Sequence, residues 1–172
     1  MIKTTRDRFT SGQASKATKV SFHNVDYWAA SGLIPPSVEE ADGPATCRVY
    51  NFPDLMALAV ARELRSSGVN LKSAKAIIDY VRKRKNYEKI DGKTIFLIQN
   101  ADGTVIEKHP SEVVNSLRTR GCTCVIDLGA IFQELNIAVK TLPRPQRGQA
   151  HLVTQESQDG HGKDQRKQKA LS

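Results

Sequence analysis

The sequence predicts an α+β fold in three successive parts, and three observations support it. Up to about residue 85, apolar residues recur at helical spacing, with one irregular interruption. From residue 93 the spacing changes to short runs of β-branched and aromatic residues. After Thr141 apolar residues are sparse, so the segment cannot offset its ordering entropy. We therefore expect four helices with a short β-hairpin, then a small β-rich α/β element, then a disordered tail over 142–172.

The first two helices are predicted by their caps and by their apolar spacing. Ser11 is an N-cap candidate for a short helix with small, inward-facing alanines. Ser21 is the second N-cap candidate, and the helix that follows it covers about 22–31. Val25 and Trp28 form the apolar stripe of this helix, so we expect Trp28 to lie in the core.

Residues 34–50 interrupt the helices, because the Pro-Pro pair near their start cannot continue one. Strand character at 47–50 makes this segment a short hairpin or wing. Pro53 then fits the first turn of a third helix. A fourth helix starts at about Leu71 and ends in the basic run 82–85.

The part that begins at residue 93 is predicted to be mainly β-structure. Residues 111–118 fit either a strand or a helix, and both alternatives stay open. The remaining expected elements are strands at 94–99, 104–106 and 122–126, a turn at 100–103 and a helix from about Leu128 to Leu135.

The net charge of +8 and the pI near 9.5 favour an anionic partner, of which nucleic acid is the commonest. Residues 1–20 carry five Lys or Arg against one Asp, and residues 53–90 carry nine against four acids. Residues 21–52 carry one basic residue against four acids, so the positive charge flanks that segment. Residues 1–8 form a basic N-terminal arm.

The sequence has no feature that indicates a membrane protein or an enzyme. No apolar run approaches the roughly 18 residues of a membrane-spanning helix, and the basic start lacks the apolar stretch of a signal peptide. We therefore expect a cytoplasmic protein with no membrane partner. Gly-x-Ser-x-Gly, His-Glu-x-x-His and Gly-rich phosphate-loop motifs do not occur, so we expect neither an enzyme nor a cofactor.

The three cysteines, Cys47, Cys122 and Cys124, cannot all pair within one chain, and we expect reduced thiols. On a strand, Cys122 and Cys124 would point to one face, so both sulfur atoms could reach one metal ion. No second Cys/His pair lies at ligand spacing. Half-buried strand cysteines are therefore the main interpretation, and a metal or redox sensor is the alternative.

An ordered set of motifs covers residues 9–85. The set consists of Phe9, Ala14, Val20-Ser21, Tyr27-Trp28, Gly32-Leu33-Ile34-Pro35-Pro36, Arg48-Val49-Tyr50, Phe52-Pro53-Asp54-Leu55 and Gly68-Val69-Asn70-Leu71. In this order and at this spacing the motifs resemble the mercury-resistance regulator (MerR) family of bacterial DNA-binding proteins, in an Asp-Tyr-Trp variant. The resemblance implies a winged helix-turn-helix over residues 9–85.

The resemblance also implies that helix 22–31 is a recognition helix in the major groove, with wing 34–50 on the flanking backbone of double-stranded DNA. Much of the family has arginines where this chain has His23 and Asp26. An aspartate that faces DNA repels phosphate and could read only the N4 amino group of cytosine. Asp26 could instead cap or pair with a neighbour such as Lys19 or Arg48. The candidate DNA-binding residues are Thr10, Ser11, Lys16, Lys19, Ser21, His23, Asn24, Asp26, Tyr27, Arg48 and Tyr50.

The implied function is that of a sequence-specific transcriptional regulator that binds a pseudo-palindromic site as a homodimer. MerR-like dimers pair through a long helix after the fourth helix, but here residues 86–93 turn into strand-like sequence. We therefore expect residues 93–141 to carry dimerisation or to bind a protein partner. The alternative is an excisionase-like accessory DNA-binding factor or an antitoxin-type interaction module; the accessory factor would occupy tandem direct repeats.

Overall fold

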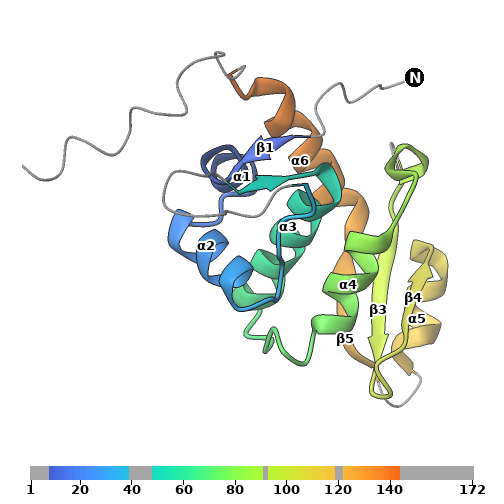
Figure 1. Ribbon diagram of the computed structural model, residues 1–172. Helices are drawn as coiled ribbons and strands as arrows, with labels where there is room; N and C mark the ends of the chain where they lie inside the picture. Colours follow the sequence, from blue (N-terminus) through green and yellow to red (C-terminus); the bar gives the residue numbers. More distant parts are fainter. Residues whose placement is uncertain (1–7, 39–47, 91–92, 119–121, 144–172) are drawn as a thin grey trace, which may run out of the picture. The chain divides into compact units, whose positions relative to one another are not determined.

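The computed structural model describes residues 8–38, 48–90, 93–118 and 122–143. Within this part, N-terminal helices with a two-stranded sheet precede a three-stranded sheet and a C-terminal helix (Figure 1). The predicted α+β class is confirmed. Residues 1–7, the tip of the expected wing and the expected tail from residue 144 onward lie outside the described residues.

Helices α1 (Ser11–Thr18) and α2 (Phe22–Ala30) begin at capped positions. The N-cap of α1 is Thr10, not Ser11 as predicted. Thr10 Oγ1 accepts a hydrogen bond from the Gln13 N–H at 3.3 Å, and Gln13 Oε1 accepts one from the Thr10 N–H at 3.1 Å. This reciprocal capping box satisfies two backbone donors at once. The predicted cap of α2 is confirmed, because Ser21 Oγ accepts from the Asn24 N–H.

The strand predicted at 47–50 is present as β2 (Val49–Tyr50), but the sequence did not predict its partner. β2 pairs antiparallel with β1 (Phe9–Thr10), so that Phe9 lies opposite Tyr50. On the other side, the Val38 N–H donates to the Val49 carbonyl at 3.2 Å. The two described sides of the wing, residues 34–38 and 48–50, are called the wing stem below. They are hydrogen-bonded to each other, and the second side is also paired with the segment before α1.

Helix α3 (Phe52–Ser66) is the central helix and is buried along most of its length. It contacts α1, α4 (Lys75–Lys83) and α6 (Leu128–Thr141). Helix α4 begins later than the predicted start at Leu71, because residues 71–74 form a turn. Asn70 Oδ1 accepts the Lys72 N–H at 2.9 Å there, and such side-chain turns compete with helix.

The second sheet has the strand order β4 (Val105–Lys108), β3 (Phe96–Asn100), β5 (Cys122–Asp127), and both pairings are antiparallel. The hairpin between β3 and β4 turns where the sequence predicted, with Gly103 at a φ of 85°. The segment that the sequence left open is a helix, α5 (Pro110–Arg118).

One face of this sheet packs on the helices. Leu97 and Ile126 form a cross-strand pair within the hydrophobic core shared by α3, α4 and α6. On the same face, the Gln99 side chain donates to the Ser73 carbonyl at 2.9 Å, just before α4. The described residues up to Leu142 form one compact unit, and the segment that starts at residue 93 shares its core with the N-terminal helices.

Helix α6 closes the core against α1 and α3 and continues beyond the predicted end at Leu135. Its Phe132 ring packs on Phe52 and Tyr87, with ring centroids 5.9 Å and 6.2 Å away. Tyr87 belongs to a short 3-10 turn, η1 (Tyr87–Ile90), that the sequence did not predict, and burial raises the pKa of its hydroxyl far above the ordinary value. Near the start of α6, a Cβ at Gly129 would meet backbone atoms of 93–95, so glycine permits this close approach.

The carboxylate of Asp54, in the first turn of α3, is fully buried and joins three segments. It accepts hydrogen bonds from the Ser37 N–H at 2.8 Å, the Ser37 hydroxyl at 2.7 Å and the Asn51 N–H at 3.1 Å. Arg82 of α4 donates Nε to the same carboxylate at 3.2 Å, and Nη2 to the Pro35 carbonyl at 2.7 Å. The wing stem, α3 and α4 are thus held at one point.

We expect Asp54→Ala to lower the free energy of unfolding by about 3–5 kcal/mol, because it leaves the largely buried Arg82 guanidinium without its counter-charge. The measurement is urea unfolding followed by circular dichroism. The matched control is Asp79→Ala on α4, which breaks the more exposed ion pair with Lys75 and should cost no more than about 1 kcal/mol. Equal effects of the two substitutions would contradict the role of Asp54.

Candidate nucleic-acid interface

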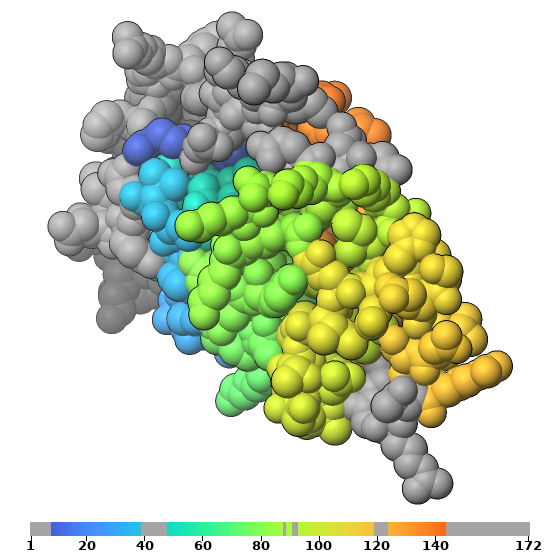
Figure 2. All heavy atoms as spheres, turned by 90° about the vertical axis from the view of Figure 1, so that its right-hand side faces the viewer, coloured from blue at the N-terminus to red at the C-terminus, as the bar shows by residue number. Residues whose placement is uncertain are grey.

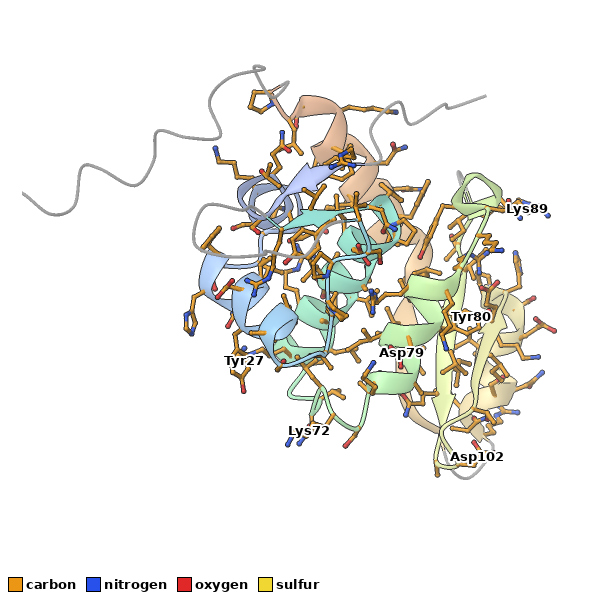
Figure 3. All side chains as sticks on the ribbon, viewed as in Figure 1. Tyr27, Lys72, Asp79, Tyr80, Lys89 and Asp102 are labelled. Atoms are coloured by element: carbon orange, nitrogen blue, oxygen red, sulfur yellow. The ribbon has the colours of Figure 1, made fainter. Side chains whose placement is uncertain are left out.

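Helix α2 has a buried face and an exposed face. Val25 and Trp28 are buried, with exposed fractions of 0% and 3%, which confirms that Trp28 is a core residue. Phe22, His23 and Tyr27 are exposed, and Tyr27 points outward from α2 (Figure 3). The core residues fix the orientation of the helix, so its exposed face is available to a partner.

Asp26 on this exposed face forms an ion pair with Arg48, the residue just before β2. The sequence suggested Lys19 or Arg48 as partners, and Lys19 instead pairs with Glu134. The Arg48 side chain is 21% exposed and the Asp26 side chain 52% exposed. The ion pair joins α2 to the wing stem and offsets the negative charge that would repel a phosphate.

Asn24 is half-buried, and its side chain is engaged within the protein. Its Oδ1 accepts a hydrogen bond from Arg65 Nη1 at 3.3 Å. Arg65 is exposed in the last turn of α3 and was not among the predicted site residues. A basic residue three positions before a glycine, here Gly68, is typical of a helix C-terminus, and this is the sequence signal that could have identified it.

Positive charge surrounds the turn between α1 and α2. Lys16 is exposed in the last turn of α1, and Lys19 takes a left-handed φ of 56° at its C-cap. Lys19 Nζ lies 2.8 Å from a carboxylate oxygen of Glu134 on α6. Arg62 of α3 donates Nη2 to Glu134 at 3.0 Å and Nη1 to the Thr18 carbonyl at 2.8 Å. Hydrogen bonds from Arg62, and then from Lys19, lower the pKa of Glu134 below its usual value.

The remaining predicted residues differ in accessibility. Thr10 and Ser11 are half-buried at the start of α1, and Ser21 is exposed at the start of α2. Tyr50 requires a correction, because it is fully buried and cannot present its side chain to a phosphate. The pairing of β2 with β1, which the sequence did not predict, places Tyr50 in the core opposite Phe9.

The cysteine pair lies on β5, where the side chain of Cys122 is outside the described residues and Cys124 is half-buried. Gln99 lies opposite Cys124, and Asn100 lies opposite Cys122, so Thr123 is an extra residue in the ladder. Among the described residues, no group of three His, Cys, Asp or Glu side chains could hold a metal ion. Cys47 lies outside them.

The geometry of α1 to α4 agrees with a comparison of the sequence with known families. Residues 9–81 match the model described as "MerR HTH family regulatory protein". Over this part, which is less than half of the chain, the sequence is similar to a MerR-type helix-turn-helix domain. No helix in the described ranges has the length and apolar character needed to cross a membrane.

The chain is also similar to proteins described as uncharacterized HTH-type transcriptional regulators. Such relatives from Mycobacterium bovis and from two strains of Mycobacterium tuberculosis are each 29% identical over 107 residues. The similarity covers 61% of this chain and 45% of each relative, so the chain spans less than half of their length.

The lowered pKa of Glu134 predicts a pH dependence. Because the folded-state pKa lies below the unfolded value of about 4.3, the stabilisation is present at neutral pH and is lost as the pH falls through the folded pKa. The carboxylate is 39% exposed, so we expect a contribution below about 1 kcal/mol. Urea unfolding between pH 7 and pH 3 should show a smaller acid-induced loss in Glu134→Gln than in the wild type. Identical losses would contradict this, and Glu112→Gln on α5 is the control.

Proposed function

We propose that this protein is a sequence-specific, DNA-binding transcriptional regulator, with α2 as its recognition helix in the major groove. The observation that carries the proposal is the exposed face of α2 backed by buried Val25 and Trp28, inside a MerR-type domain. The description of the mycobacterial relatives as transcriptional regulators supports it. The matched family is regulatory and not enzymatic, and the regulator would act in the cytoplasm, where bacterial DNA lies.

The surroundings of α2 suit a duplex backbone. The N-terminus of α2 after Ser21, and that of α1 after Thr10 and Ser11, can donate backbone N–H groups to phosphates. Lys16 adds positive charge beside the turn, while the charge of Lys19 is offset by Glu134. These contacts fix the position of the protein on DNA, whereas side chains on the exposed face of α2 contact the base edges.

Arg48 takes a more specific part in this proposal. It directly precedes β2 and pairs with Asp26 of α2, and we propose that the same guanidinium contacts a flanking phosphate when DNA is bound. While Asp26 holds the guanidinium, its charge is partly cancelled. The ion pair therefore limits sequence-independent attraction to DNA, which comes almost wholly from positive charge.

We expect Asp26→Asn to strengthen binding to all duplexes and to steepen the slope of log affinity against log salt by about one, because Arg48 then neutralises a phosphate. Arg48→Ala should act in the opposite direction. Both effects are measured by fluorescence anisotropy at several salt concentrations, on a duplex that the protein selects from a randomised pool and on a scrambled duplex. The control is Asp79→Asn, which removes the same charge from α4 and should change neither the affinity for DNA nor its salt dependence. If the wild-type protein binds no duplex at low salt, the proposed function is wrong.

We further propose that the regulator is a homodimer that uses the segment 93–141. In the described residues, α4 ends at Lys83 and is followed by η1 and β3, so a long pairing helix does not follow it. Helix α5 has no fully buried residue, and its Val114 and Leu117 are 56% and 52% exposed. The helix lies at the surface beside β4 (Figure 2). Exposed neighbouring apolar side chains of this kind favour a protein contact.

We expect the double substitution Val114→Glu and Leu117→Glu to convert a dimer into a monomer, because two carboxylates per chain would be buried without partners. Sedimentation equilibrium of the full chain measures the mass. Ile137→Glu is the matched control, since Ile137 is 66% exposed on α6, and it should stay dimeric. A wild-type monomer at every concentration, or a dimeric double variant, would rule out this use of α5.

A further inference from the structure

Exposed aromatic side chains gather on the recognition helix. Among the described residues, the large apolar side chains that are clearly exposed are Phe22, Tyr27, Val114, Leu117 and Ile137. The aromatic members of this set, Phe22 at 59% and Tyr27 at 61%, both belong to α2. Phe22 has no polar group, so its exposure to water serves neither hydrogen bonding nor the core.

Two of the polar side chains of α2 that the sequence suggested for DNA contact, Asn24 and Asp26, are already engaged. Asn24 Oδ1 accepts from Arg65, and the Asp26 carboxylate pairs with Arg48. Recognition of adenine by asparagine uses the same Oδ1 together with the amide nitrogen. These protein contacts hold both side chains toward Arg65 and Arg48 and compete with a base for them, whereas Phe22 has no polar contact to compete.

Phe22 is also at the right end of the helix. It is the first residue of α2, directly after the N-cap Ser21, and recognition helices contact bases mainly with their N-terminal residues. In the major groove the apolar feature of a base pair is the thymine C5-methyl group, and phenylalanine is one of the side chains that contact it.

We propose that Phe22 contacts a thymine methyl group in the major groove and is a specificity-determining residue of this protein. The proposal rests on the proposed DNA-binding function. The partner of the exposed Phe22 ring is therefore a base step that contains thymine. His23 is exposed beside Phe22 and can contact the edge of a neighbouring base. Discrimination at that base pair comes from apolar contact, not from hydrogen bonds.

The test removes the methyl group alone. The full-length protein first selects its preferred duplex from a randomised pool, and each thymine of that duplex is then replaced singly by uracil, which keeps the base pairing. At one or two positions the wild type should bind about fourfold more weakly, the affinity equivalent of one buried methyl group. Phe22→Ala should bind the thymine duplex more weakly and should lose the difference between thymine and uracil at those positions.

Two variants keep the outcome clear. Phe22→Leu retains an apolar side chain and should retain part of the discrimination, and Ile137→Ala, a surface substitution on α6, should retain all of it. Thermal midpoints establish that each variant is folded. Wild-type binding that is indifferent to every uracil, or equal discrimination by Phe22→Ala, would overturn the proposal while leaving DNA binding intact. A failure to select any duplex would instead overturn the proposed function and this inference with it.

Discussion

The buried carboxylate of Asp54 is the point on which the N-terminal part of the molecule depends. A carboxylate without solvent must be matched on all its acceptor sites, and here the wing stem, the start of α3 and Arg82 of α4 supply the donors. Three segments that are distant in the sequence are therefore held together by their hydrogen bonds to one carboxylate. The position of the wing stem relative to α3 follows from this arrangement, since Ser37 donates from both its backbone and its side chain.

A second theme is that several side chains near α2 are engaged within the protein. Two cations are paired with carboxylates, Arg48 with Asp26 and Lys19 with Glu134, whereas Arg65 donates to the neutral Asn24 and keeps its net charge. Exposed ion pairs contribute little to stability, so their effect lies mainly in the electric field that a duplex would meet. When these charges are paired, the protein attracts DNA of any sequence less strongly. Shape and apolar contacts then contribute a larger share of the binding energy.

The sequence predicted those elements whose signals are local. The cap at Ser21, the core position of Trp28 and the hairpin turn near Gly103 each depend on a few adjacent residues, and each is confirmed. The sequence analysis chose Ser11 as the N-cap and not Thr10. Thr10 is recognised as the cap only when Gln13, the other half of the Thr-x-x-Gln capping box, is considered with it.

Properties that depend on distant residues were not predictable in the same way. Tyr50 was assigned to the surface because nothing local indicates that β2 pairs with β1, across some 40 residues. Likewise, the engagement of Asn24 by Arg65 and of Lys19 by Glu134 joins α2 and the α1–α2 turn to helices that follow much later. The sequence could nominate candidate site residues, but it could not say which of them are buried, such as Tyr50, or held by distant partners, such as Asn24.

The packing of α6 has an implication for how the molecule can be divided. The sequence match ends at residue 81, yet α6 covers a face of α3 and α1 with Ile131, Phe132 and Leu135. A fragment cut at residue 85 would turn this apolar face toward water and remove Glu134 from Arg62 and Lys19. The helix-turn-helix is therefore not a module that can be transplanted alone: a hybrid regulator built on it would have to carry the chain as far as Leu142.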